Sequence, residues 1–97
     1  MRRGLLIFLR MRIKEIHYSS RYTKSLKRCG LQRKLIERKI DDFIRNPFSK
    51  SLKTHKLSGK LEGYWSFSVN YHFRVIFYFI DENIVGFVDI GTHEIYK

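Results

Sequence analysis

Cysteine, proline and acidic residues are scarce in this sequence of 97 residues, which has one cysteine (Cys29), one proline (Pro47) and nine aspartates and glutamates. A single cysteine excludes an intramolecular disulfide framework, and no CxxC motif or His/Cys cluster has the spacing of zinc ligands. We therefore expect no metal and no other cofactor, and a reducing compartment such as the cytoplasm.

Long apolar runs are also missing. The apolar stretch at residues 4–9 ends at Arg10 and is too short to cross a membrane, and no small-residue cleavage site of a signal peptide follows it. We expect no membrane association. Residues 1–10 are interpreted as an N-terminal extension or an artefact of an upstream start, and residues 11–97 as a single domain.

The shortage of acids leaves the chain strongly basic. Twenty Lys and Arg residues against nine acids give a formal net charge of +11. Residues 1–60 carry 18 basic and four acidic side chains, whereas residues 61–97 carry two and five. A cationic surface of this kind favours a polyanionic partner, such as nucleic acid or an acidic protein.

Two segments have the periodicity of amphipathic helices. Ser19 or Ser20 can cap the first helix, and Gly30 ends it. The second helix starts near Leu31 and ends at the Asn46-Pro47 pair, because a proline disfavours helical backbone in the residue before it. Its apolar face is formed by Leu35, Ile36, Ile40, Phe43 and Ile44.

Aromatic and β-branched residues predict three strands after the helices, and a weaker alternation predicts one before them. The four strands are expected at residues 11–18, 64–70, 72–80 and 84–90. The basic segment 48–63 is expected to be a loop or a short strand. This order predicts an α+β fold, a four-stranded antiparallel sheet with two N-terminal helices packed on one face.

Three residues outside the predicted core can carry chemistry. His93 follows the last strand, where a rigid sheet can hold it in place, and His55 lies in the basic loop. Arg74 lies on one face of the middle strand, opposite apolar neighbours, and a cation there needs an anionic partner. That partner is either Asp89 on the next strand or a bound phosphate, which a planar guanidinium holds well.

Lysines and tyrosines near these residues are candidates for RNA contacts. Lys53, Lys56 and Lys60 cluster around the loop, although charged runs of this kind often only keep a surface soluble. Tyr71 and Tyr96 are placed to stack on bases. We therefore expect RNA contacts from Lys53, Lys60, His72, Tyr71 and Tyr96.

Several segments together resemble the RelE/ParE toxin superfamily of type II toxin-antitoxin modules, in particular its RelE and YafQ-like branch. They are HKLSG, WSFSV, FRVIF and IGTH, together with the NPF that ends the second helix. The resemblance extends over residues 11–96. It implies a small sheet with two helices on one face, in agreement with the periodicity.

The resemblance also implies an activity and two partners. It implies a toxin that cuts messenger RNA at codons in the ribosomal A site and is silenced by a cognate antitoxin protein. His55 and Lys56 match positions where this branch has a catalytic His or Lys, and His93 matches a catalytic His or Arg. Arg74 matches the arginine of the third-strand motif.

The sequence departs from the family pattern at three positions. His72 stands where YafQ-like toxins carry an active-site acid, and Asp89 stands where an arginine is expected. The C-terminal helix with a catalytic tyrosine does not fit in the remaining length, and Tyr96 is the substitute we consider.

The implied chemistry uses the RNA 2′-hydroxyl as the nucleophile, so that neither a metal nor a covalent intermediate is needed. We assign His55 as general base and His93 as general acid, with the order reversible, and Arg74 and Lys56 as the phosphate clamp. One alternative is a non-catalytic inhibitor of DNA gyrase of the ParE type. Another is a basic domain that binds RNA without cutting it.

Overall fold

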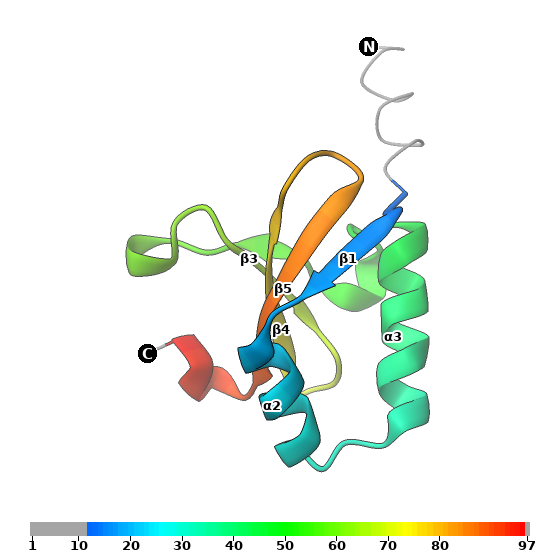
Figure 1. Ribbon diagram of the computed structural model, residues 1–97, viewed down its shortest axis with the longest axis vertical. Coiled ribbons are helices and arrows are strands. Elements are labelled where there is room, and N and C mark those ends of the chain that lie inside the picture. Colours follow the sequence, from blue (N-terminus) through cyan, green and yellow to red (C-terminus); the bar gives the residue numbers. More distant parts are fainter. Residues whose placement is uncertain (1–11, 97) are drawn as a thin grey trace.

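The computed structural model describes residues 12–96 (Figure 1). The predicted extension at residues 1–10 lies outside the described residues. None of the helices in the described part is long and apolar enough to cross a membrane. The elements are β1 (Glu15–Tyr18), α2 (Ser20–Arg28), α3 (Arg33–Arg45), β2 (His55–Lys56), β3 (Trp65–Ser68), β4 (Arg74–Phe79) and β5 (Ile84–Gly91), with the short 3₁₀ helices η1 (Lys50–Leu52), η2 (Gly59–Leu61) and η3 (His93–Tyr96).

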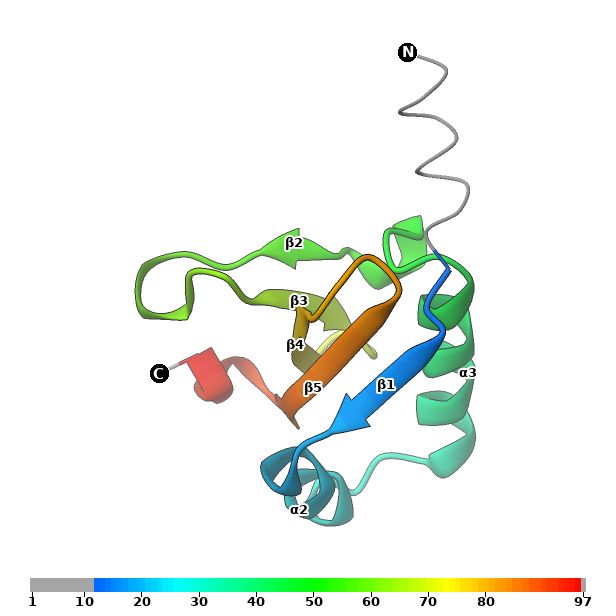
Figure 2. The same ribbon diagram turned by 45° about the horizontal axis from the view of Figure 1, so that its top comes forward.

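The sheet has five strands in the order β1-β5-β4-β3-β2 (Figure 2). The expectation of an α+β fold with two helices is confirmed, but that of a four-stranded, wholly antiparallel sheet is wrong. β2 adds a fifth strand at one edge by pairing antiparallel with β3. At the other edge β1 pairs parallel with β5, while the β3, β4 and β5 pairings are antiparallel as predicted.

Three strands are shorter than expected, and local hydrogen bonds explain the later start of two of them, β1 and β4. The backbone N–H of Ile13 donates to the carbonyl of Ile44 near the end of α3. Ile13 is therefore bonded to the helix and not to a strand, and β1 begins only at Glu15. The side chain of Asn70 accepts from the N–H groups of His72 (3.0 Å) and Phe73 (2.8 Å). That Asx turn delays the start of β4 to Arg74.

Both helices begin or end on the residues that the sequence indicates. The Ser19 hydroxyl accepts from the N–H of Tyr22 at 2.9 Å and so caps α2. Gly30 follows that helix with φ +72°, a left-handed conformation that favours glycine. α3 ends before Asn46, whose side chain accepts from the N–H of Phe48 at 2.9 Å.

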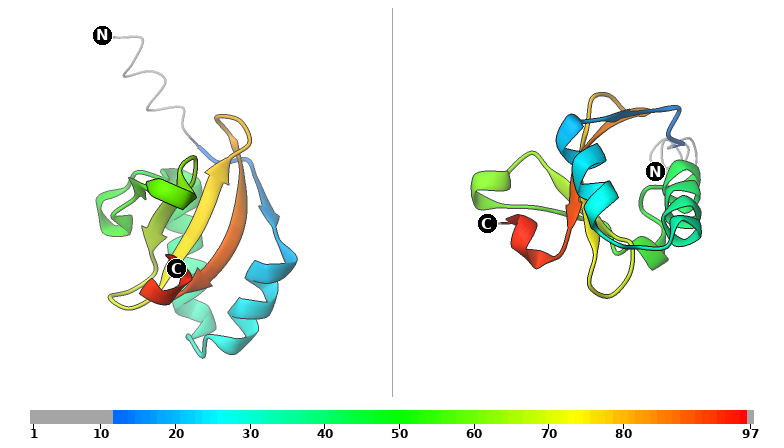
Figure 3. Two further views of the ribbon diagram at one scale, coloured as in Figure 1. Left: turned by 90° about the vertical axis from the view of Figure 1, so that its left-hand side faces the viewer. Right: turned by 60° about the horizontal axis from the view of Figure 1, so that its bottom comes forward.

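The two helices cover one face of the sheet, and the core lies between them and the strands. Phe43 of α3 has its ring centroid 4.7 Å from that of Phe67 and 5.4 Å from that of Phe87, and Tyr22 of α2 lies 5.3 Å from Phe87. We call this the helix face. η3 lies on the other side, which we call the open face (Figure 3, right).

Candidate active site

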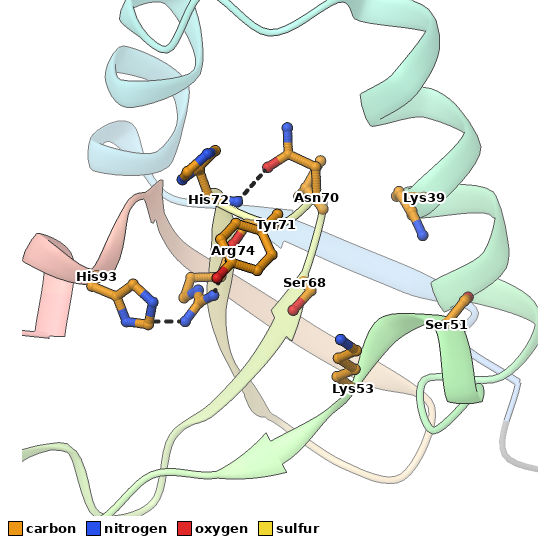
Figure 4. Close-up of a pocket in the computed structure, with 10 residues that line it drawn as sticks. Lys39, Ser51, Lys53, Ser68, Asn70, Tyr71, His72, Arg74 and His93 are labelled. Carbon is orange, nitrogen blue, oxygen red and sulfur yellow. Dashed lines mark hydrogen bonds between the residues drawn. The ribbon is translucent and has the colours of Figure 1, made fainter.

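A cleft of about 440 Å³ opens at the turn between β3 and β4 (Figure 4). It brings together residues from α3, η1, both strands of this hairpin and the start of η3. The lining contains no carboxylate. It consists of Lys39, Ser51, Lys53, Ser68, Val69, Asn70, Tyr71, His72, Arg74 and His93.

Arg74 is the first residue of β4 and lies between Ser68 and Gly91 on the neighbouring strands. Its Nη1 lies 3.1 Å from Nδ1 of His93, and its Nη2 lies 3.5 Å from the carbonyl oxygen of Tyr71. Its Nε is buried and has no hydrogen-bond partner within residues 12–96. Beyond the two contacts above, Nη1 and Nη2 each carry a second N–H, so the guanidinium retains donor capacity for an anion in the cleft.

The alternative partner of Arg74, the carboxylate of Asp89, is engaged elsewhere. Asp89 is buried on β5, and its Oδ2 lies 3.2 Å from Nε of Arg21 on α2. This ion pair accounts for the aspartate that the family pattern does not predict. Arg74 is left facing the histidine rather than an acid.

His93 is the first residue of η3, separated from the end of β5 by Thr92 alone, and is exposed. Because a guanidinium can only donate, Nδ1 of His93 accepts this hydrogen bond. The ring proton is thereby assigned to Nε2. The structure thus brings His93 together with Arg74, two of the four predicted catalytic residues.

η3 is held against the open face by two contacts. The Tyr96 hydroxyl lies 2.6 Å from Oγ of Ser66, which is 1% exposed in the middle of β3. The second contact is that of Ile95 in η3 with the backbone of Gly91. A Cβ at residue 91 would collide with the Ile95 side chain, so glycine allows η3 to lie this close to β5. The Tyr96 ring centroid lies 6.1 Å from that of His93 and 5.9 Å from Cζ of Arg74.

His55 lies on β2, outside the cleft lining, but on the same open face. It pairs in register with Ser66, so the two side chains share a face of the sheet. Its Nδ1 lies 2.9 Å from the carbonyl oxygen of Lys53. A carbonyl only accepts, so Nδ1 carries the hydrogen and Nε2 has a free lone pair.

Lys56 and Lys60 are not brought to the cleft. Lys56 pairs in register with Trp65, and its Nζ lies 5.4 Å from the Trp65 ring, on the sheet face opposite to His55. Lys60 lies in η2. Of the predicted RNA contacts, Lys53, Tyr71 and His72 line the cleft, and Tyr96 lies beside it.

Four polar lining residues were missed by the sequence reasoning. Asn70 and Ser68 belong to the end of a strand and its turn, where polar residues are a weak sign of a site. Ser51 lies in the basic loop. Lys39 is one of several lysines and arginines on α3, and only its half-buried position in the folded chain sets it apart. The missed residues are Lys39, Ser51, Ser68 and Asn70.

Comparison with known proteins identifies the family of the chain and agrees with its fold. A family model described as the RelE-like toxin of the type II toxin-antitoxin system HigB matches residues 13–91. The chain belongs to this family of RelE-like toxins, and the resemblance seen in its segments is confirmed. A search of curated proteins finds no match.

Solved structures share the fold. The chain is similar to YafQ from E. coli strain BL21(DE3), with 22% identity over 84% of this chain and 94% of that one and a TM-score of 0.72. It is similar to a chain of the E. coli DinJ-YafQ toxin-antitoxin complex, with 25% identity over 82% and 92% and a TM-score of 0.68. It is also similar to the YoeB/ParE toxin from Agrobacterium tumefaciens, with 16% identity over 82% and 99% and a TM-score of 0.67.

Proposed function

We propose that this toxin is an endoribonuclease that cuts messenger RNA at the ribosome and so inhibits translation. The observation that carries the proposal is the contact between Arg74 and His93, 3.1 Å apart, in a basic cleft without carboxylates. RNA cleavage requires a cation that clamps the phosphate and groups that transfer protons, and this pair supplies the clamp and one of those groups.

The reaction needs a base, an acid and a clamp. In our assignment Nε2 of His55 takes the proton of the RNA 2′-hydroxyl, whose oxygen attacks the adjacent phosphorus. The bond from phosphorus to O5′ breaks, and His93 supplies the proton to that oxygen. The products are a 2′,3′-cyclic phosphate and a 5′-hydroxyl, and Arg74 stabilises the charge that develops on the phosphate.

The ring hydrogens favour this order of roles. His55 donates from Nδ1 to a carbonyl, which leaves Nε2 free to accept a proton. His93 accepts from Arg74 at Nδ1. When Arg74 turns to a phosphate, Nδ1 of His93 is released and can take up a proton, which gives the imidazolium that acts as the acid.

The regulatory partner we propose is an acidic antitoxin protein encoded with the toxin. The DinJ-YafQ structure is that of a toxin-antitoxin complex, and this chain shares the fold. Residues 1–60 contain 18 basic and only four acidic side chains, which favours a partner of opposite charge.

The test compares His93→Gln with His17→Gln, an exposed histidine on β1 outside the cleft lining. We expect His93→Gln to lower the cleavage rate by about two to four orders of magnitude while RNA binding and folding persist. His17→Gln should leave the cleavage rate, RNA binding and folding unchanged. Primer extension on messages from cells that express each variant measures the cuts.

The gyrase alternative predicts a different result. A ParE-type inhibitor would arrest growth equally well with His93→Gln, with damaged DNA and intact messages. Equal cutting by the wild type and His93→Gln would instead remove His93 from the catalytic role.

A further inference from the structure

The wall of the cleft farther from His93 has its own set of cations. Lys39 of α3 is half-buried, and Lys53 follows η1; both line the cleft together with Ser51. Within residues 12–96 the three ion pairs are those of His17 with Glu15, Arg21 with Asp89 and Arg33 with Glu37, so neither lysine is paired with an acid. A partly buried lysine without a counter-ion favours an anionic ligand.

Lys53 provides a second, independent observation. It is the one residue other than glycine with a positive φ in the described part, at 51°. This left-handed conformation is unfavourable for a residue with a side chain, and such strain tends to occur at functional sites. The strained residue lines the cleft with its side chain and accepts the hydrogen bond of His55 with its carbonyl.

These cations are separated from Arg74 and His93 by the β3 strand. In Figure 4, Arg74 and His93 lie on one side of Ser68, and Lys39 and Ser51 lie on the other. One continuous cleft of about 440 Å³ joins the two groups. An extended polyanion can therefore contact both groups at once.

We propose that Lys39, Lys53 and Ser51 form a second phosphate subsite, which binds the phosphate next to the one held by Arg74. The proposal rests on the proposed function, in which Arg74 and His93 act on the scissile phosphate. It defines the ligand as a single-stranded RNA segment with at least two consecutive phosphates. Binding at this subsite fixes the register of the strand on the catalytic residues.

The experiment measures binding without cleavage. The probes are a 2′-O-methyl dinucleoside monophosphate and the same molecule with one added phosphate at its 5′ or its 3′ end, titrated by NMR. We expect the added phosphate at one of the two ends to strengthen wild-type binding about 5- to 10-fold, as a charge-assisted hydrogen bond does. Lys39→Met is expected to abolish this gain.

Two further variants keep the test interpretable. Lys34→Met removes an exposed lysine of the same helix that does not line the cleft, and it should retain the gain. Lys53→Gly removes the side chain while glycine accepts the positive φ, so it should lose the gain and still fold. With longer single strands, each lost contact should reduce the slope of log Kd against log salt by about 0.7.

Two results would overturn the subsite. One is a wild type that gains nothing from either added phosphate, and the other is an equal loss in Lys34→Met and Lys39→Met, which would mean only general charge attraction. RNA cleavage by a wild type that shows no gain would leave the proposed function intact. A gain without cleavage of any RNA would support the subsite and refute the ribonuclease.

Discussion

The two faces of the sheet differ in what their side chains do. On the helix face, aromatic rings from three strands pack around Phe43 of α3, which is fully buried. On the open face, polar groups from β3, β4 and η3 form a chain of contacts that includes Ser66, Tyr96, His93 and Arg74. One face holds the fold together, and the other positions the candidate catalytic groups.

Because the two faces differ in this way, we expect mutations to separate effects on stability from effects on activity. A buried aromatic cluster loses both packing and solvent exclusion when it is truncated. A polar pair on the surface contributes little to stability, but small displacements of it change a reaction rate strongly. Changes on the helix face should therefore act on the free energy of unfolding, and changes on the open face on the cleavage rate.

The largest effect on stability is expected from Phe43→Ala, on the helix face. We expect it to lower the free energy of unfolding by about 3 to 5 kcal/mol, because the ring is fully enclosed by Phe67, Phe77 and Phe87. Urea denaturation followed by circular dichroism measures this. Phe43→Leu, which keeps most of the volume, should cost clearly less.

A loss below about 1 kcal/mol for Phe43→Ala would contradict a core centred on this ring. The open-face variant His93→Gln should stay within about 0.5 kcal/mol of the wild type in the same measurement, since it is exposed. An equal loss in both variants would remove the distinction between the faces.

The hydrogen bond between Ser66 and Tyr96 tests whether the open face controls the cleavage rate by positioning η3. We expect Ser66→Ala to reduce the cleavage rate about 10-fold, because the 2.6 Å contact holds η3 and, with it, His93. Tyr96→Phe should do the same. Each should cost only about 1 kcal/mol of stability, well below the loss expected for Phe43→Ala.

The double variant distinguishes positioning from direct contact with RNA. If the two hydroxyls act only through each other, the double variant should be no slower than either single variant. Losses that multiply, with an increase in KM for Tyr96→Phe alone, would show instead that Tyr96 contacts the substrate.

The sequence predicted the helix face well and the edges of the sheet poorly. Caps, a glycine stop and apolar periodicity are local signals, and they located α2 and α3 within a few residues. β2 is only His55–Lys56 in a basic segment, too short for any alternation to be visible. The parallel pairing of β1 with β5 depends on contacts distant in sequence, which a local pattern does not encode.

The candidate site was predictable only in part for the same reason. Arg74 and His93 were assigned to one site through the family resemblance, as phosphate clamp and general acid, and they form a hydrogen bond. Lys56 and His55 are neighbours in sequence, but alternation along a strand sends them to opposite faces. Lys39 enters the cleft from α3, and nothing in its helical periodicity distinguishes it from the solvated lysines around it.

The smallest effect is expected from Tyr22→Phe, and it tests whether any polar group on the helix face has a role. The Tyr22 hydroxyl is buried and has no hydrogen-bond partner within residues 12–96. A buried hydroxyl without a partner costs stability, so Tyr22→Phe should raise the free energy of unfolding by up to about 1 kcal/mol, with cleavage unchanged.

The same substitution should change the response to alkaline pH. Burial raises the pKa of Tyr22 above its ordinary value of 10.0, so the unfolded chain loses this proton at a lower pH than the folded chain. The wild type should therefore lose stability as the pH rises above about 10, and Tyr22→Phe should lose less. Tyr71→Phe, at a residue that is 86% exposed, is the control and should match the wild type at every pH. A Tyr22→Phe variant less stable than the wild type at neutral pH would mean that the hydroxyl has a favourable contact, and that the helix face is not purely a packing surface.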